Sequence, residues 1–211
     1  MQKNWFIIII LVVLINCNSA FSQTRYFEIL SGISCNFSHN SKYSKLSSLN
    51  FKPGINTCLG FGTNYLYDFL RIYGSVSYTS KGEKYKISGK KFESDLDVFE
   101  LKPSIRLYFP DIPIYVGGGA FLSFAASNNI KIDQINYNYE TKNYYRKVNF
   151  GPLLQAGSEI GVGSVRLLAD LCLEYGIINY SKVSNTKIHS FCILFNIGGS
   201  FIIFDKNFKH Y

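Results

Sequence analysis

One stretch of the sequence, residues 148–177, constrains the fold more than any other, because apolar and polar residues alternate along it twice. The alternation stops at Gly161-Val162-Gly163-Ser164, which is a turn signal, and then resumes. Successive side chains of a strand point to opposite faces, so the stretch predicts a β-hairpin with one apolar face and one charged face. Each arm exceeds the ~5–6 residues of an ordinary globular strand. Long arms of this kind suit a sheet with lipid against its apolar face.

The first 22 residues have the features of a secretory signal peptide. Lys3 precedes an apolar run over residues 5–15, and Ala20-Phe21-Ser22 matches the small-x-small pattern of a cleavage site. The run is shorter than the ~20 residues that span a bilayer. We therefore expect cleavage after Ser22 and export of residues 23–211. A lipoprotein signal ending at Cys17 is the alternative, and it fits less well because the bulky Asn16 precedes the cysteine.

The same alternation recurs along the exported part, which gives eight expected strands. They cover residues 26–38, 54–67, 70–86, 96–109, 114–126, 148–160, 165–177 and 187–204. Short connections follow the second, fourth and sixth strands, whereas longer polar segments follow the others, at residues 39–52, 87–94, 127–146 and 181–186. Sequential antiparallel strands place all the short turns at one end, which is typical of outer-membrane barrels with periplasmic turns and extracellular loops. The sequence predicts an all-β fold with one domain, residues 23–211: an eight-stranded antiparallel up-and-down transmembrane β-barrel, closed because lipid offers no partner to a sheet edge.

Several phrases of the sequence carry a resemblance to a known family. They are GFGTNYLYDFLRIYGSVSYTSKGEKYK, FELKPSIRLYF, PIYVGGGAF and FGPLLQAGSEIGVG. Together with the leader and the strand pattern, they resemble the PorT-like outer-membrane β-barrel family of Gram-negative bacteria. The resemblance covers nearly all of residues 23–211 and implies an outer-membrane location. Its founding member is linked to a protein secretion system, but a fold does not determine a function.

The predicted polar faces of the strands carry nine charged residues, five acids and four bases. They are Glu28, Arg71, Glu100, Lys102, Arg106, Glu159, Arg166, Asp170 and Glu174. The interior of an eight-stranded barrel is just wide enough for side chains to fill it. We therefore expect these residues to form a packed network of ion pairs and hydrogen bonds. A conducting pore is the alternative, and pores are built from more strands.

The predicted loops are strongly basic, in a chain with a formal net charge of +8. Their bases are Lys42, Lys45, Lys52, Lys81, Lys84, Lys86, Lys90, Lys91, Lys131, Lys142, Arg146, Lys147, Lys182 and Lys187. The anionic layer of lipopolysaccharide is a physical partner for such a rim. The alternative is that the lysines only solvate the loops. Nucleic acid is a poor candidate, because no binding motif accompanies the charge.

Tyr137, Tyr139, Tyr144 and Tyr145 in the longest loop either contact a glycan or partner protein, or extend two strands into an aromatic belt at the membrane surface. The leading function is thus a non-enzymatic outer-membrane barrel whose loops, at Lys84, Lys90, Lys91 and these tyrosines, contact lipopolysaccharide or a partner. One alternative is an accessory component of a secretion or surface-assembly complex. Another is a soluble exported barrel that carries an apolar ligand, with its aliphatic face turned inward.

The sequence predicts no catalytic residues, cofactor or metal. His39, His189 and His210 do not lie at a spacing that pairs one of them with a nucleophile and an acid. Cys35, Cys58, Cys172 and Cys192 match no zinc or redox motif. Cys172 and Cys192 fall on neighbouring predicted strands with their side chains on one face. Two buried thiols are the favoured interpretation there, and a cross-strand disulfide is the alternative.

Overall fold

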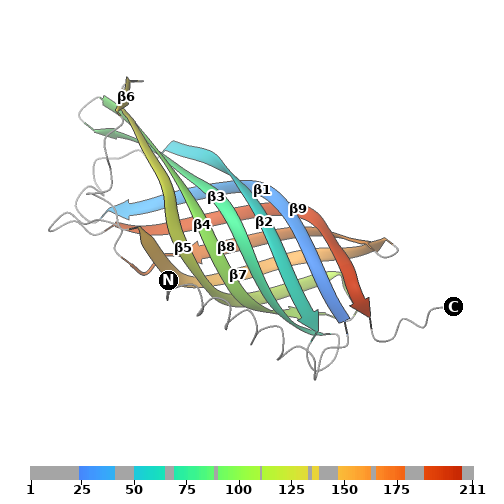
Figure 1. Cartoon of the computed structure of the whole chain (residues 1–211). Helices are drawn as coiled ribbons and strands as arrows, with labels where there is room; N and C mark the ends of the chain where they lie inside the picture. Colours follow the sequence, from blue (N-terminus) through green and yellow to red (C-terminus); the bar gives the residue numbers. More distant parts are fainter. Residues whose placement is uncertain are drawn as a thin grey trace, which may run out of the picture.

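The protein is a β-barrel (Figure 1). The computed structural model describes residues 24–40, 50–64, 69–87, 90–109, 111–132, 135–137, 147–162, 165–178 and 188–205. The expected leader lies outside these residues. The strands are β1 (Thr24–Asn40), β2 (Asn50–Asn64), β3 (Leu70–Ile87), β4 (Lys90–Tyr108), β5 (Ile114–Ile132), β6 (Ile135–Tyr137), β7 (Val148–Val162), β8 (Val165–Tyr175) and β9 (Ile188–Asp205).

Eight of these strands form a closed antiparallel ring. The order is β4-β3-β2-β1-β9-β8-β7-β5, and a further pairing of β4 with β5 closes it. The first and last strands pair along their length, from Thr24 with Asp205 to Asn40 with Ile188. The short β6 lies outside the ring, on the end of β5. The predicted eight-stranded up-and-down barrel is therefore confirmed.

The register of the strands fixes the tilt of the barrel. Starting from Asn36 on β1, successive cross-strand partners lead round the ring and return to β1 at Tyr26, a displacement of ten residues, through Cys192, Glu174, Leu153, Gly119, Ser104, Tyr73 and Gly62. Ten residues of shear in eight strands correspond to a tilt of about 40°. Residues that pair on neighbouring strands therefore lie at different heights along the barrel axis. Side chains that meet across the lumen come from strands that are not paired in one hairpin.

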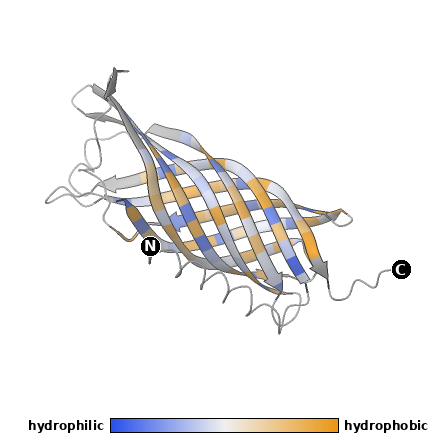
Figure 2. Cartoon of the chain, in the orientation of Figure 1, coloured by the Kyte–Doolittle hydropathy of each residue, from blue (hydrophilic) through white to orange (hydrophobic). Residues whose placement is uncertain are grey.

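Alternate residues of the strands face the lumen and the outside. Figure 2 shows the matching alternation of hydrophilic and hydrophobic residues along the ribbons. On β7 the outward Phe150 and Leu154 are 48% and 63% exposed, whereas the inward Leu153 is 1% exposed. The outward positions are largely apolar and the inward ones largely polar. A ligand carrier with its aliphatic face inward does not have this arrangement.

Several strands continue further than the sequence predicted, most of all β4 and β5. Residues 87–94 were expected to form a loop, but β3 reaches Ile87 and β4 begins at Lys90, with these two residues paired. Residues 127–146 were expected to be irregular, but β5 reaches Ile132 and pairs with β6. The lysine-rich sequence suggested loops here, but the strands continue past the point where the apolar alternation ends. In Figure 1, β3, β4 and β5 extend beyond the rest of the barrel beside β6.

Candidate functional site: the charged interior

Two ends of the barrel can be distinguished by their connections. We call the end with the short connections β2–β3, β4–β5 and β7–β8 the turn end, and the opposite end the loop end. The structure places all nine predicted interior charges in the lumen, in two groups at different heights. It adds a tenth, Lys81, which the sequence had assigned to a loop. Lys81 is 3% exposed and points into the barrel from β3, so its assignment to a loop was wrong.

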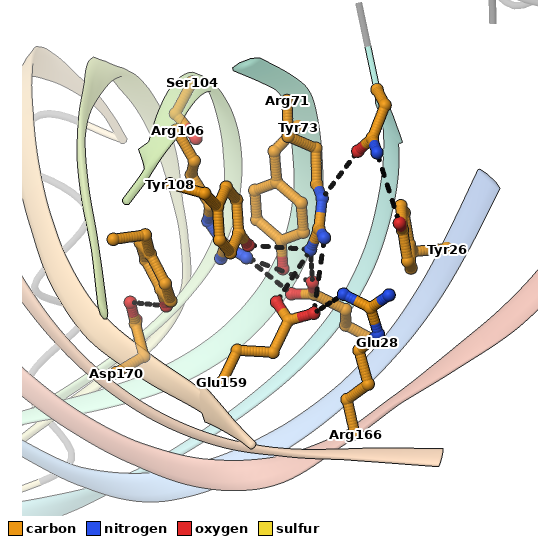
Figure 3. A network of polar contacts seen from close by, with 12 residues as sticks. Tyr26, Glu28, Arg71, Tyr73, Ser104, Arg106, Tyr108, Glu159, Arg166 and Asp170 are labelled. Atoms are coloured by element: carbon orange, nitrogen blue, oxygen red, sulfur yellow. Dashed lines mark hydrogen bonds and ion pairs between the residues drawn. The ribbon is translucent and has the colours of Figure 1, made fainter. Parts of the chain in front are cut away.

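The first group, which we call the turn-side cluster, contains Glu28, Arg71, Arg106, Glu159, Arg166 and Asp170 (Figure 3). Arg71 Nη1 donates to Glu159 Oε2 at 2.9 Å and lies 3.4 Å from Glu28 Oε1. Arg106 Nη1 donates to both oxygens of Glu28, at 2.8 and 3.1 Å. Arg166 Nη1 donates to Glu159 Oε1 at 2.6 Å. Two carboxylates therefore hold three guanidinium groups.

Tyrosine rings stack on the two buried arginines. The guanidinium of Arg106 lies 3.5 Å from the ring centroid of Tyr73 and 4.7 Å from that of Tyr115. Arg71 lies in the same way 3.8 Å from Tyr26 and 4.3 Å from Tyr108. Cation–π contacts of this kind are strongest where the cation has lost its water. They let Arg71 and Arg106, which are direct cross-strand partners, remain together inside the barrel.

Glycines on neighbouring strands make room for these rings. A Cβ on Gly60 would lie 2.0 Å from Tyr73 Oη, and one on Gly157 would lie 2.5 Å from Tyr115 Cζ. Each tyrosine thus covers a position where the neighbouring strand has no side chain. The alternation of the sequence placed these glycines on the inward face, but it did not indicate which ring each of them accommodates.

Asp170 completes the turn-side cluster through neutral donors. Tyr115 Oη donates to Asp170 Oδ1 at 2.6 Å, and Asn196 Nδ2 donates to Oδ2 at 3.4 Å. Tyr115 therefore contacts both charges, because its ring stacks on Arg106 and its hydroxyl binds the carboxylate.

The second group, which we call the loop-side ring, consists of Lys81, Glu100, Lys102 and Glu174. Lys81 Nζ lies 2.6 Å from Glu100 Oε1 and 2.9 Å from Glu174 Oε2. Lys102 Nζ lies 2.8 Å from Glu100 Oε2 and 2.7 Å from Glu174 Oε1. Each lysine therefore contacts both glutamates. The side chains of all four are at most 5% exposed.

An apolar cluster lies on the strands β5, β7, β8 and β9 of the lumen wall. It consists of Phe121, Leu153, Cys172, Cys192 and Leu194. Lys81 Nζ lies 5.4 Å from the centroid of the Phe121 ring, so the cluster adjoins the loop-side ring. Cys172 and Cys192 are free thiols, as are Cys35 and Cys58. The structure thus has the favoured arrangement of two buried thiols rather than the disulfide.

The remaining features of the described residues concern metal binding and His189. In the described ranges, no three His, Cys, Asp or Glu side chains are grouped so that they could hold a metal ion. His189 Nδ1 lies 3.2 Å from the carbonyl oxygen of Gly176, which is an ordinary polar contact. No helix in the part of the chain that the structure describes is long and apolar enough to cross a membrane.

Some of the seven residues predicted to make contacts from the loops lie on strands, and others lie outside the described residues. Lys84 lies on β3, is partly exposed, and pairs with Glu93 at 3.2 Å. Lys90 and Lys91 belong to β4, and Tyr137 ends β6. Tyr139, Tyr144 and Tyr145 lie outside the described residues. The strands β3–β6 therefore carry four of the seven predicted contact residues at the loop end.

Comparisons with known proteins find similar solved structures but no matching family. No protein-family model and no curated protein matches the chain. Among solved structures, Neisserial surface protein A is 16% identical with a TM-score of 0.44, covering 83% of this chain and 96% of that one. Outer membrane protein AlkL, solved in DMPC bilayers, is 11% identical with a TM-score of 0.39, covering 92% and 96%. The N-terminal β-barrel domain of Pseudomonas aeruginosa OprF is 11% identical with a TM-score of 0.30, covering 80% and 96%. The fold assignment rests on the strand pairing of this chain itself.

Proposed function

We propose that the protein is a non-enzymatic barrel that spans the bacterial outer membrane. The observation that supports this proposal is the apolar outer surface of the barrel. On β9 the outward apolar positions run from Phe191 to Ile203. Twelve residue steps of about 3.3 Å on a strand tilted by about 40° cover about 30 Å along the barrel axis, close to the thickness of a bilayer's hydrocarbon core.

This apolar band has no charge in it. On β4 the outward residues from Phe99 to Leu107 are Phe, Leu, Pro, Ile and Leu, and the first acid beyond them is Asp97. Within the described ranges, no outward position between these levels on any of the eight strands carries an ionised side chain. Water-soluble monomers rarely expose apolar patches beyond a few hundred Å². A closed barrel with a continuous apolar band suits lipid, which requires every backbone group to be paired within the protein.

The location can be tested by fractionating cells and by gel mobility. The protein should partition with outer membranes and require detergent for extraction. A closed barrel should also migrate differently on a gel before and after boiling. Recovery from the soluble periplasmic fraction without detergent would contradict the membrane span.

Contact with lipopolysaccharide is the role we propose for the loop end. The support is the lysine-rich extension of β3, β4 and β5, whose point charges suit phosphate without base-specific or enzymatic chemistry. The purified protein should bind lipopolysaccharide micelles more weakly as salt rises, because exposed charges are screened. Lys90→Gln with Lys91→Gln should weaken binding further, and Arg166→Gln at the turn end is the matched control. Equal binding by both variants would contradict this role.

An accessory role in a secretion or surface-assembly complex is the second candidate, and the resemblance to PorT-like barrels favours it. Gentle solubilisation followed by a pull-down separates the two candidates. A complex would bring the same companion proteins in stoichiometric amounts, whereas a barrel that always emerges alone would count against the second candidate.

A further inference from the structure

With Lys81 counted in the loop-side ring, each of the two charge groups has as many bases as acids. The turn-side cluster contains three acids and three arginines, and the loop-side ring contains two acids and two lysines. A buried group with unbalanced charge is costly. Because each group is balanced on its own, neither needs the other to compensate it.

Both groups extend across the lumen. Lys81 on β3 and Glu174 on β8 are four steps apart in the ring of eight strands, so their 2.9 Å contact joins opposite walls. In the turn-side cluster, Arg71 on β3 reaches Glu159 on β7, and Arg106 on β4 reaches Glu28 on β1. Near the loop-side ring the lumen also holds the apolar Phe121, Leu153 and Leu194, which are at most 2% exposed. The hydroxyls of Ser77 and Thr79 donate to Glu100 there.

A short segment of lumen separates the two groups, and two thiols lie in it. On β8, Cys172 is the inward residue between Asp170 of the cluster and Glu174 of the ring. On β2, Cys58 pairs with Ser77, which is inward on β3 between Tyr73 and Lys81. The Cys58 sulfur lies 4.0 Å from Tyr73 Oη. Both cysteines are at most 6% exposed.

We propose that the two charge groups are seals in series, which close the lumen to water at two levels and enclose a compartment that contains Cys58 and Cys172. The lumen of an eight-stranded barrel is narrow enough for side chains to close it. The inference goes beyond the proposed membrane function and does not depend on it, since the seals belong to the folded barrel in a detergent micelle as well.

The native thiols report whether the compartment is closed. The experiment uses the full chain with Cys17→Ser and Cys35→Ser, folded in detergent micelles and treated with a small water-soluble methanethiosulfonate. Peptide mass mapping gives the rate of labelling at Cys58 and Cys172. In the folded parent both should label about a hundredfold more slowly than in urea, because they reach water only when the fold opens.

Charge-balanced truncations remove one seal at a time. Lys81→Ala with Glu174→Ala opens the loop-side ring, and Arg106→Ala with Glu28→Ala opens the turn-side cluster. Each pair should raise the labelling rate of Cys58 and Cys172 at least about tenfold while the gel mobility still shows a folded barrel. Lys84→Ala with Glu93→Ala is the matched control, because this charge-balanced pair is partly exposed and belongs to neither group, and it should leave labelling unchanged.

The outcomes separate the alternatives. Fast labelling of Cys58 in the folded parent would overturn the proposal, because the lumen would then be open to water. Continued protection in a folded double variant would show that the truncated group is not a seal. If the Arg106 and Glu28 pair prevents folding, Arg71→Ala with Glu159→Ala removes the other half of the same cluster and decides the question. None of these results depends on whether the barrel lies in a membrane.

Discussion

The turn-side cluster and the loop-side ring both hold charges inside one narrow lumen, but they do so with different side chains. The cluster uses arginines whose flat guanidinium groups stack between tyrosine rings, and the ring uses lysines, which are compact point charges on flexible stems. The guanidinium of Arg106 lies against the rings of Tyr73 and Tyr115, at 3.5 and 4.7 Å from their centroids, whereas Lys81 Nζ lies 5.4 Å from the centroid of the Phe121 ring. We infer that the cluster is the rigid part of the interior and the ring the adaptable part.

The pattern of partners points the same way. Glu28 is the acid that Arg106 contacts, and Arg71 reaches it as well. In the ring each lysine has two glutamates and each glutamate has two lysines. Loss of the Glu28 side chain therefore leaves Arg106 without its carboxylate partner in the cluster. Loss of any one side chain of the ring leaves each remaining member with at least one partner.

The largest effect is expected for Glu28→Ala. Removing one member of a buried ion pair leaves a charge without compensation, at a cost of about 3–5 kcal/mol in the free energy of unfolding. Urea unfolding in lipid vesicles, followed by gel mobility, measures it. Glu93→Ala is the control, because its pair with Lys84 is partly exposed and such pairs contribute below about 1 kcal/mol. Similar losses for the two variants would contradict the rigid role of the cluster.

A second test concerns the glycines that accommodate the tyrosines. Gly60→Ala should destabilise the barrel by about 1–3 kcal/mol, because the new methyl group overpacks against the Tyr73 ring. Gly74→Ala is the matched control, since a Cβ at Gly74 meets nothing within 4 Å. The same unfolding measurement applies to both. A Gly60→Ala barrel as stable as the Gly74→Ala barrel would mean that Tyr73 can move away, and that the stack on Arg106 is not tightly held.

The strands could be predicted from the sequence because the outer face of the barrel follows a simple rule. Outward residues must be apolar, and the two-residue period of a strand makes that visible in a single segment such as residues 165–177. The nine predicted interior charges were found for the same reason, since a charge within such a segment can only face the lumen. The rule holds only where the outward residues are apolar, so it could not locate the ends of strands that continue beyond them, as β4 and β5 do.

Lys81 shows where this reasoning fails. It lies among Ser80, Gly82, Glu83 and Lys84, near the end of the predicted strand 70–86, where no apolar alternation shows which side chains face the lumen. Its partner Glu174 lies 93 residues away, and only the ten-residue shear of the closed ring brings the two together. Which charges meet is therefore a property of the whole barrel rather than of any hairpin. The tyrosine–arginine stacks could not be predicted for the same reason.

The adaptable character of the ring leads to a third prediction. Lys81→Met should cost about 1–3 kcal/mol, less than Glu28→Ala, because Lys102 still contacts both Glu100 and Glu174. Adding Glu174→Gln restores neutrality, so the double variant should lose less stability than the two single variants summed. Additive losses would show that the four charges do not act as one ring.

The smallest effect is expected for Arg166→Gln, which tests whether the strength of the cluster comes from burial or from charge alone. Arg166 Nη1 makes the shortest contact of the cluster to Glu159, at 2.6 Å, but its side chain is 32% exposed. Glu159 also keeps Arg71 as a partner. The loss should stay below about 1 kcal/mol and shrink further in high salt, because water and ions screen a pair at the mouth of the barrel. A loss as large as that of Glu28→Ala, unchanged by salt, would mean that the rim arginine is as essential as the stacked ones, and that stacking between tyrosines is not what makes the cluster rigid.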